Sequence, residues 1–304
     1  MKIGVYAIAR NEAANVQPWL KAVNEADVVC VTDTGSTDDT VQQLLDGGAV
    51  VSFYEGEFRF DKARNFALEK AKACNVDIWV SLDLDEWPEK GWYKRLEAAA
   101  TDGCRGWRIT IDNGSYSFQN IRAHRQEGWW WEHACHEVLY GDGPIGDAGF
   151  KVVHHQDLGK PRDYLPLLEL DAKENPRDGR AWHYLGREYM YLGGWEPAIN
   201  ALSNAYTYDK WDEQAAMSLV YRSRCYWHRG KTQEAVADAW QAVQIFGSRE
   251  AWVHLAWLLD NLGDPTAGIA AENALKIRKH GTYPSEPGAW GPLAGDIARK
   301  WSEA

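Results

Sequence analysis

The first half of the chain alternates short apolar runs with amphipathic segments. Four runs have the length and the β-branched, apolar composition of buried strands: 3–9, 27–33, 49–54 and 77–83. Between them, apolar positions recur with helical spacing in three segments: about 12–24, 37–46 and 61–73. This order predicts right-handed βαβ crossovers and a mainly parallel sheet, whose ligands bind beyond the carboxyl ends of the strands.

After about residue 160 the strand pattern gives way to helical segments that repeat. Three segments have Trp, Leu, Gly or Ala at the spacings of a tetratricopeptide helix pair, the middle one more loosely: 181–206, 218–243 and 251–275. Three such repeats are about the minimum that a stack needs to bury a continuous core. The sequence therefore predicts an α/β domain at 1–158 and an all-α repeat domain at 159–304, with the boundary near "DLGKPRDY".

Composition narrows the class of protein. The chain has 304 residues and a formal charge of -11, which argues against broad attraction to nucleic acid or anionic membranes but allows a local basic patch. Five cysteines without a CxxC pair suggest neither a disulfide framework nor a cysteine zinc site. No stretch approaches the roughly 20 apolar residues of a membrane span, and the N-terminus lacks the apolar region of a signal peptide. We therefore expect a cytoplasmic protein that does not bind membranes.

Carboxylates crowd the end of the fourth predicted strand. The stretch "WVSLDLDEWP" places Asp83, Asp85 and Glu86 within four positions. If the backbone stays extended, Asp83 and Asp85 point the same way and repel each other. Mn²⁺ or Mg²⁺, which binds one or two carboxylates together with substrate phosphates, would relieve this repulsion. The alternative is a solvated acidic loop or the first turn of a helix, where acids favour the positive end of the helix dipole.

Two further polar motifs lie on the same predicted scaffold. In "VTDTGSTDDT", Asp33 and Gly35 follow the second strand, where Gly allows close approach and Asp can bond a sugar or a base. The alternative is that these residues form a helix N-cap. In "FDKARNFALEKA", Arg64 lies near a helix start and could neutralise a phosphate, or it is an exposed arginine paired with Asp61 or Glu69.

Taken together, these motifs resemble a known family. The set "IARNEAANV", "VTDTGSTDDT", "FRFDKARNFAL" and "WVSLDLDEWP" resembles the nucleotide-sugar-binding half of family 2 glycosyltransferases, inverting enzymes of the Rossmann-like GT-A fold. One branch of that family carries tetratricopeptide repeats after the transferase domain, so the layout matches over residues 1 to about 275. The resemblance implies a nucleoside-diphosphate sugar as donor, with a UDP-sugar favoured, and Mn²⁺ or Mg²⁺ as cofactor.

The resemblance also implies roles for the matching residues around the donor. Asp33 would bond the nucleobase, Arg10 and Glu12 would line the nucleoside pocket, and Arg64 would lie by the diphosphate. The positions expected to contact the donor are Ala9, Arg10, Glu12, Asp33, Gly35, Arg64, Asp83 and Leu84.

For the metal, the resemblance implies Asp85 as the direct ligand, with Asp83 on the ribose or on a metal-bound water. The stretch "FKVVHHQD" reads as an apolar strand that ends in two histidines. GT-A enzymes often add a late histidine as a further metal ligand, and His154 matches that position better than His155. A structural histidine bonded to the backbone is the alternative.

An inverting transfer needs a base that takes the acceptor's proton. The segment "GWWWEHACHEVLYG" resembles the stretch ending in "HE" in the repeat-bearing transferases. Glu137 is therefore the predicted base, and Glu132 and Asp112 are the alternatives.

Aromatic and basic residues suggest where an acceptor binds. Three adjacent indoles, Trp129, Trp130 and Trp131, cannot all face one core, so some are expected to stack on a sugar or an acceptor, or to close over the donor. The first helix of each repeat places basic and aromatic residues on the concave face: Arg180, His183, Arg187, Tyr191, Arg224, Trp227, His228 and Trp257. This strip predicts a groove for an acidic peptide or a nucleic-acid strand, and chance exposure is the alternative.

The leading hypothesis is a metal-dependent inverting glycosyltransferase that moves a hexose from a nucleoside diphosphate to a macromolecular acceptor. The acceptor is a peptide or protein, or hydroxymethylated DNA bases, as for phage enzymes that act in the host cytoplasm. The alternative from a different class is a non-catalytic scaffold whose repeats bind a partner. The identity of the sugar and the presence of a homodimer stay open.

Overall fold

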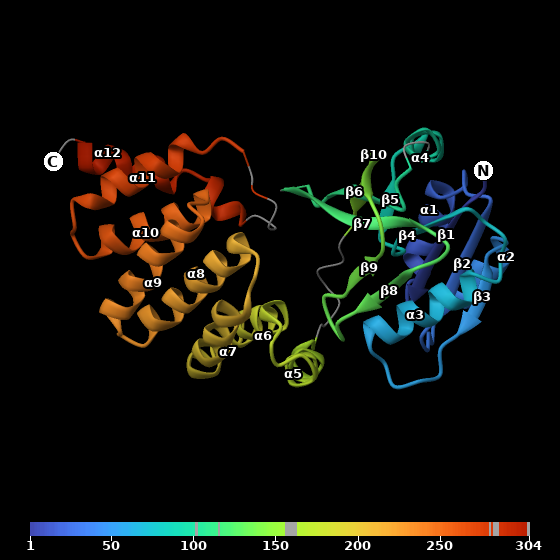
Figure 1. Cartoon of the computed structure of the whole chain (residues 1–304), viewed down its shortest axis with the longest axis horizontal. Coiled ribbons are helices and arrows are strands. Elements are labelled where there is room, and N and C mark those ends of the chain that lie inside the picture. Colours follow the sequence, from blue (N-terminus) through green and yellow to red (C-terminus); the bar gives the residue numbers. More distant parts are fainter. Residues whose placement is uncertain (101–102, 115, 156–162, 280, 282–285, 303–304) are drawn as a thin grey trace. The chain divides into compact units, whose positions relative to one another are not determined.

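The computed structural model describes residues 1–100, 103–114, 116–155, 163–279, 281 and 286–302 (Figure 1). The chain divides into two compact units, Met1–Arg162 and Asp163–Ala304. The predicted domain boundary between 158 and 159 lies outside the described residues. Each unit buries its own apolar core, so each can be described by itself.

The first unit is built on an eight-stranded sheet with the order β3-β2-β1-β4-β7-β6-β10-β5. Its strands are β1 (Ile3–Ala9), β2 (Val28–Asp33), β3 (Val50–Phe53), β4 (Ile78–Ser81), β5 (Glu86–Pro88), β6 (Gly106–Asp112), β7 (Ser117–Arg125) and β10 (Ile145–His154). The four predicted strands β1 to β4 are parallel, whereas β7 is antiparallel to β4 and β6, and β5 is antiparallel to β10. The sheet is therefore mixed: the four strands that the sequence predicts form one parallel part, and β6 and β10 form a second parallel pair.

Helices connect the parallel strands, as the sequence predicts. They are α1 (Ala13–Ala22), α2 (Thr40–Asp46) and α3 (Phe60–Ala71), and α4 (Trp92–Ala99) follows β5. Helix α3 packs on β1 and β2 and also contacts β8 (Trp129–Glu132), which pairs with β9 (Val138–Gly141) in a separate ribbon (Figure 1). Because α3 contacts both the sheet and this ribbon, its side chains can reach residues of both.

The second unit consists of helix pairs. After α5 (Leu165–Glu174) the pairs are α6 (Gly179–Tyr191) with α7 (Trp195–Tyr208), α8 (Asp212–His228) with α9 (Thr232–Ile245), and α10 (Arg249–Asn261) with α11 (Thr266–Lys276). The turn inside each pair contains Gly193, Gly230 or Gly263, with φ between 70 and 76°, a left-handed conformation that favours glycine. Helix α8 contacts both α6 and α10, so the first helices stack in order and the predicted repeats are confirmed. The 3₁₀ turn η1 (Pro287–Trp290) and α12 (Leu293–Ser302) follow.

Two expectations from the composition concern membranes and disulfides. Within the described part of the chain, no helix combines the length and the apolar character that crossing a bilayer requires. None of the five cysteines is in a disulfide. The sulfurs of Cys30 and Cys74 lie 3.8 Å apart, and burial raises the pKa of Cys30 to about 12, so it packs as a thiol.

Candidate active site

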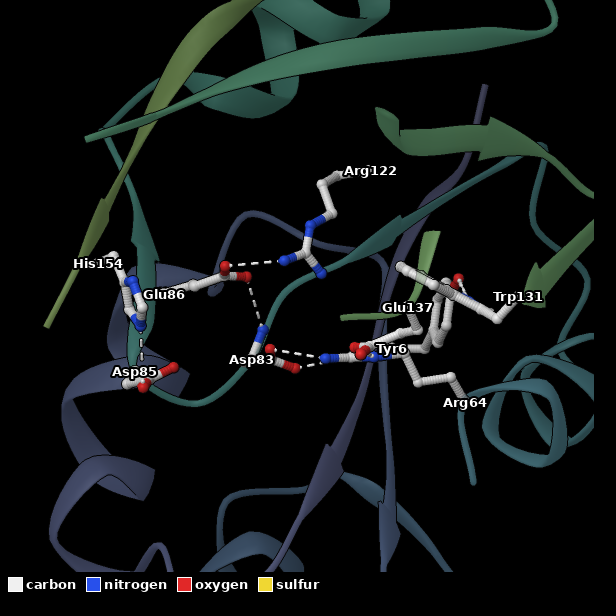
Figure 2. Close-up of polar contacts among 9 residues, drawn as sticks. All are labelled: Tyr6, Arg64, Asp83, Asp85, Glu86, Arg122, Trp131, Glu137 and His154. Carbon is white, nitrogen blue, oxygen red and sulfur yellow. Dashed lines mark hydrogen bonds and ion pairs between the residues drawn. The ribbon is translucent and has the colours of Figure 1, made fainter. Parts of the chain in front are cut away.

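The sheet topology brings the polar motifs to one edge. Strands β1, β2 and β4 run parallel, so their carboxyl ends lie together. Strand β7 reverses the direction and β6 restores it, and β10 runs parallel to β6. The carboxyl end of β10, which carries His154, therefore lies at the same edge as the carboxylates that follow β4 (Figure 2).

A buried arginine joins two of the predicted site residues. Arg64 of α3 is 4 % exposed, and its Nη1 and Nη2 donate to Oδ1 and Oδ2 of Asp83, each at 2.8 Å (Figure 2). Its Nε donates to Oε1 of Glu137. Asp61 and Glu69, the alternative partners from sequence, pair with other residues. Arg64 therefore links the predicted donor site to the predicted base.

Electrostatics keep the Arg64–Asp83 pair charged. Burial acts to raise the pKa of Asp83, but the guanidinium of Arg64 outweighs it and lowers that pKa to about 2. Burial likewise acts to lower the pKa of Arg64, and the carboxylates of Asp83 and Glu137 raise it above its ordinary value. Both groups are therefore ionised at neutral pH.

The chain turns after β4, which separates the two aspartates. The amide of Glu86 donates to the Asp83 carbonyl at 2.9 Å, and the Asp83 amide donates to Oε2 of Glu86 at 3.0 Å. Glu86 is buried, which raises its pKa, and Arg122 donates to its Oε1 at 3.1 Å. Because of this turn, Asp83 and Asp85 face different partners, so the expectation that they point the same way is corrected (Figure 2).

Asp85 meets His154 instead. His154 Nε2 lies 3.2 Å from Asp85 Oδ2, and its Nδ1 lies 3.0 Å from Oδ1 of Asn113. The hydrogen bond to Asp85 raises the pKa of His154. His155 turns elsewhere, because its ring stacks on Trp87 with centroids 3.8 Å apart. Of the two histidines, His154 is therefore the one that shares a site with Asp85.

The donor atoms of this pair fit a divalent cation. One carboxylate and one imidazole suit Mn²⁺, and Asn113 would hold the imidazole with Nε2 facing the ion. In the described ranges, no group of three or more His, Cys, Asp or Glu residues is arranged to hold a metal. Such a two-residue set is normal for a cation that takes its other ligands from substrate phosphates and water.

Asp33 closes β2 in a tight turn. Its Oδ2 accepts hydrogen bonds from the amides of Gly35 and Ser36, both at 2.9 Å. Gly35 has a φ of +102°, and there is open space where a side chain would stand. The other oxygen, Asp33 Oδ1, is buried without a hydrogen-bond partner among the described residues. An N–H from the edge of a nucleobase would satisfy it, as the sequence-based role requires.

The remaining predicted donor contacts lie at the same edge with different exposure. Arg10 is exposed after β1, and Glu12 accepts a hydrogen bond from Asn15 at 2.7 Å. The Ala9 carbonyl accepts from the Thr34 amide at 2.9 Å, and Leu84 is buried. Ala9 and Leu84 are thus part of the frame of the site, and Arg10 presents a charged side chain to solvent.

The three adjacent tryptophans alternate along β8. Trp129 and Trp131 are 4 % and 3 % exposed in a core cluster, whereas Trp130 is 41 % exposed. Successive residues of a strand point to opposite faces, so the pattern follows directly from the strand. The expectation of acceptor contacts is therefore narrowed to Trp130, because neither buried ring presents a face to solvent.

The alternative bases have partners of their own. Glu132 accepts a hydrogen bond from Nε1 of Trp130 at 2.7 Å, and Asp112 accepts one from the Gly114 amide at 2.8 Å. Neither hydrogen bond involves Arg64 or Asp83. Glu137 is thus the candidate that shares a hydrogen-bond network with the predicted donor site.

A buried network positions Arg64 and was not anticipated from sequence. Nε1 of Trp131 donates to the Tyr6 hydroxyl at 3.0 Å, which lies 3.2 Å from Nε2 of His124. Burial lowers the pKa of His124 to about 4, so the ring is neutral at pH 7, and its Nδ1 donates to the Arg125 carbonyl at 2.8 Å, which leaves Nε2 as an acceptor. The guanidinium of Arg64 lies 5.0 Å from the centroid of the Trp131 ring, and the Asn65 amide holds the Trp131 backbone through two hydrogen bonds of 2.8 Å.

The signal for some of these missed residues is visible in hindsight. In "SFQNIRAHR", Arg122 and His124 are two apart and so share one face of β7. Two basic residues on one strand face could have suggested ion pairs with the carboxylates that follow β4. Asn113 gave no such signal, because a lone asparagine after a strand is typical of any turn.

The concave strip of the helical unit differs from the prediction in two places. His183 is fully buried, with Nδ1 2.7 Å from Oγ of Ser218, so it does not line an open face. Arg224, expected to contact an acceptor, pairs with both carboxylate oxygens of Glu286 at 3.0 and 2.6 Å. Arg187 lies against a ring, with its guanidinium 4.6 Å from the centroid of Tyr184.

Comparison with protein families gives one match. The model described as "Glycosyl transferase family 2" matches residues 5–158, just over half of the chain. A search of curated proteins gives no match.

Among solved structures, glucosyl-3-phosphoglycerate synthase from Mycobacterium tuberculosis, crystallised with Mn²⁺, UDP and glucosyl-3-phosphoglycerate, is 23 % identical with a TM-score of 0.32. That match covers 36 % of this chain and 44 % of the synthase. MamA is 18 % identical over 46 % of this chain and 85 % of its own, with a TM-score of 0.34. The first tetratricopeptide domain of Spaghetti (RPAP3), bound to an HSP90 peptide, is 19 % identical over 42 % of this chain and 94 % of its own, with a TM-score of 0.33. TM-scores this low support no inference about this chain.

Proposed function

The chain belongs to glycosyl transferase family 2, and we propose that it transfers a hexose, with inversion, from a nucleoside-diphosphate sugar to a macromolecular acceptor. The resemblance of the sequence motifs to family 2 glycosyltransferases favours UDP as the nucleotide. The observation that carries the proposal is the meeting of two clusters at one sheet edge. One is the Asp85–His154 pair, and the other is the network of Arg64, Asp83 and Glu137 (Figure 2).

Residues of β2, α3, the turn after β4 and β10 would hold the donor and its metal. Asp33 Oδ1, buried and without a partner in the described residues, would accept from the nucleobase. Arg64 uses three of its five N–H groups on Asp83 and Glu137, which leaves two for the diphosphate. Asp85 and His154 would hold Mn²⁺ or Mg²⁺, which when bound supplies positive charge to the diphosphate leaving group.

Glu137 would take the proton of the acceptor. A general base must lie within hydrogen-bond reach of the attacking hydroxyl, and the Glu137 side chain is 11 % exposed and so not sealed in the core. Arg64 holds one carboxylate oxygen of Glu137, and the second oxygen is the one that would accept the proton. The Trp131 ring lies against the guanidinium of Arg64 and would help to hold this geometry.

The proposal is tested first by binding. UDP with Mn²⁺ should raise the melting temperature of the full chain more than either alone, and Asp85→Ala should remove the part that depends on the metal. Asp46→Asn, an exposed aspartate on α2, is the matched control and should behave as the unchanged protein.

Turnover then separates an enzyme from a scaffold. UDP release is measured from a panel of UDP-sugars with peptide acceptors and with hydroxymethylated DNA, and NMR of the product reports whether the anomeric configuration is inverted. Asp85→Ala should lower turnover by at least about 100-fold, since metal stabilisation of the leaving group is worth several kcal/mol. A chain that neither binds UDP with Mn²⁺ nor turns over any donor would be a scaffold, and the proposal would be wrong.

A further inference from the structure

The helical unit contains a pocket lined by aromatic side chains. It has a volume of about 530 Å³, within the range of roughly 300–1,000 Å³ that is usual for small-molecule sites. Its walls come from α6, α7, α8 and α10 and from the segment that includes η1. The aromatic residues in these walls include Tyr191, Trp195, Trp227 and Trp257.

The rings of this pocket hold one another in place. The ring of Trp195 stacks on His228 with centroids 4.2 Å apart and planes 3° from parallel. Trp227 and Trp257 meet edge to face, with centroids 5.5 Å apart and planes at 69°. All three indoles also pack against the core of the unit. Because the rings are positioned before any ligand arrives, a ligand that stacks on them loses little affinity to ordering them.

The polar groups in the walls already have partners within the protein. Arg224 and Glu286 form a bidentate pair, so one positive and one negative group cancel. Glu250 accepts a hydrogen bond from Nε1 of Trp290 at 2.9 Å. His254 lies 2.8 Å from Oγ of Ser223, and burial holds its pKa well below the ordinary value, so it is neutral at pH 7.

This combination points to an uncharged ligand with both apolar and hydroxylated surface. A pyranose ring has apolar C–H faces that pack on flat indoles and an edge of hydroxyl groups that each donate and accept. Arg224 offers donors and Glu286 offers acceptors side by side, which suits adjacent hydroxyls. A carboxylate or phosphate would have to displace Glu286 from Arg224, and the pocket gains nothing in exchange.

We propose that the pocket of the helical unit, at Trp195, Trp227, Trp257 and the Arg224–Glu286 pair, is a binding site for a neutral saccharide. The site lies wholly within the helical unit. It therefore contains none of the donor-site residues, and it does not depend on the proposed transferase activity. It also replaces the acidic peptide or nucleic-acid strand that the basic strip suggests from sequence, because the central arginine of that strip is already neutralised.

The experiment measures saccharide binding to the full chain by saturation-transfer NMR and calorimetry, with EDTA present and no nucleotide. The probes are methyl glucoside, methyl galactoside, methyl N-acetylglucosaminide, cellobiose, lactose and maltose. At least one neutral probe should bind, and Trp195→Ala should weaken it by about tenfold or more, equivalent to roughly 1.4 kcal/mol. Trp240→Ala, which removes an exposed tryptophan of the same unit outside the pocket, should leave binding unchanged.

A second variant keeps the test decisive if Trp195→Ala unfolds. Glu286→Gln retains the size of the side chain but leaves Arg224 without its counter-charge, so it should weaken neutral probes and strengthen methyl glucuronide relative to methyl glucoside. The proposal is overturned if no neutral probe binds, if neither pocket variant changes the binding, or if only oligoglutamate or oligothymidylate binds at the pocket. The response to UDP and Mn²⁺ is measured in parallel and should be unchanged in both variants, so failure of the saccharide site is distinguishable from failure of the donor site.

Discussion

The edge of the sheet and the pocket of the helical unit differ in how their charges balance. At the sheet edge, Asp83 and Glu137 share the positive charge of Arg64, Asp85 contacts the imidazole of His154, and an oxygen of Asp33 has no partner within the described residues. In the pocket, Arg224 is paired with Glu286, Glu250 accepts a hydrogen bond from Trp290, and many of the other wall residues are aromatic.

This difference indicates the kind of ligand each site takes. Carboxylates brought together in excess are stabilised by a cation, and a cation at a surface edge brings phosphate with it. In the pocket the only lining arginine among the described residues is already paired with Glu286, so an anion gains no such attraction, and shape and apolar contact decide the affinity. Changes in ionic conditions should therefore affect ligand binding strongly at the sheet edge and weakly at the pocket.

The largest expected effect is at the base. Glu137→Gln should lower kcat by about 10²–10⁴, the usual contribution of a general base, because the amide cannot take the proton of the acceptor. Stabilisation by UDP and Mn²⁺ should persist, since Glu137 is not placed on the donor. Steady-state kinetics and thermal shift measure the two effects. Glu132→Gln is the control, and a larger loss there would move the base to Glu132.

The second largest effect is expected on stability, from replacing Arg64, which joins the carboxylates of Asp83 and Glu137. Arg64→Met should lower the free energy of unfolding by about 3–5 kcal/mol, because it leaves Asp83 and Glu137 without their counter-charge in a largely buried site. Arg95→Met, which breaks a pair with Glu89 at the surface, should cost only about 0.2–1 kcal/mol. Urea unfolding compares the two. Equal effects would mean that the Arg64 network does not stabilise the unit.

A smaller effect should appear with pH in the first unit. Burial lowers the pKa of His124 from 6.5 to about 4, so between these values the unfolded chain binds a proton that the folded unit does not. The contribution of His124 to stability is therefore complete above about pH 6.5, falls as the pH drops towards 4 by up to about 1.4 kcal/mol per unit, and then levels off.

Hydrogen exchange of the β1 amides, followed against pH, isolates this unit from the helical one. His124→Asn keeps an acceptor for the Tyr6 hydroxyl and should flatten the dependence between pH 6.5 and 5. An unchanged slope in that variant would assign the pH effect to other groups.

The smallest effect should be that of salt on the pocket. Raising ionic strength from about 0.01 to about 1 M shortens the screening length from about 30 to about 3 Å, which should weaken binding of UDP with Mn²⁺. Binding of a neutral saccharide should change by less than about twofold, because no net charge is involved. Calorimetry at several salt concentrations measures both. A steep salt dependence at the pocket would contradict the binding of an uncharged ligand there.

The sequence by itself determined the elements and the grouping of motifs. The runs at 3–9 and 27–33 are strands with nearly those limits, because alternating and continuous apolar runs leave a chain few other ways to bury them. The helical repeats follow from the same physics at a period of 3.6, with a glycine at each turn. Asp33, Asp83 and Asp85 could be placed at one edge because parallel strands end together, whereas His154 came from the family resemblance and reaches that edge because β10 pairs in parallel with β6.

The tertiary structure decided which of these side chains meet. The turn after β4 sends Asp83 to Arg64 and Asp85 to His154, a choice that depends on a hydrogen bond from Glu86 and not on the spacing of the two aspartates. Glu286 reaches Arg224 across 62 positions of the chain, and no local pattern announces such a pair. Periodicity reports which face of an element is buried, whereas partners distant in sequence are selected by packing and charge in three dimensions.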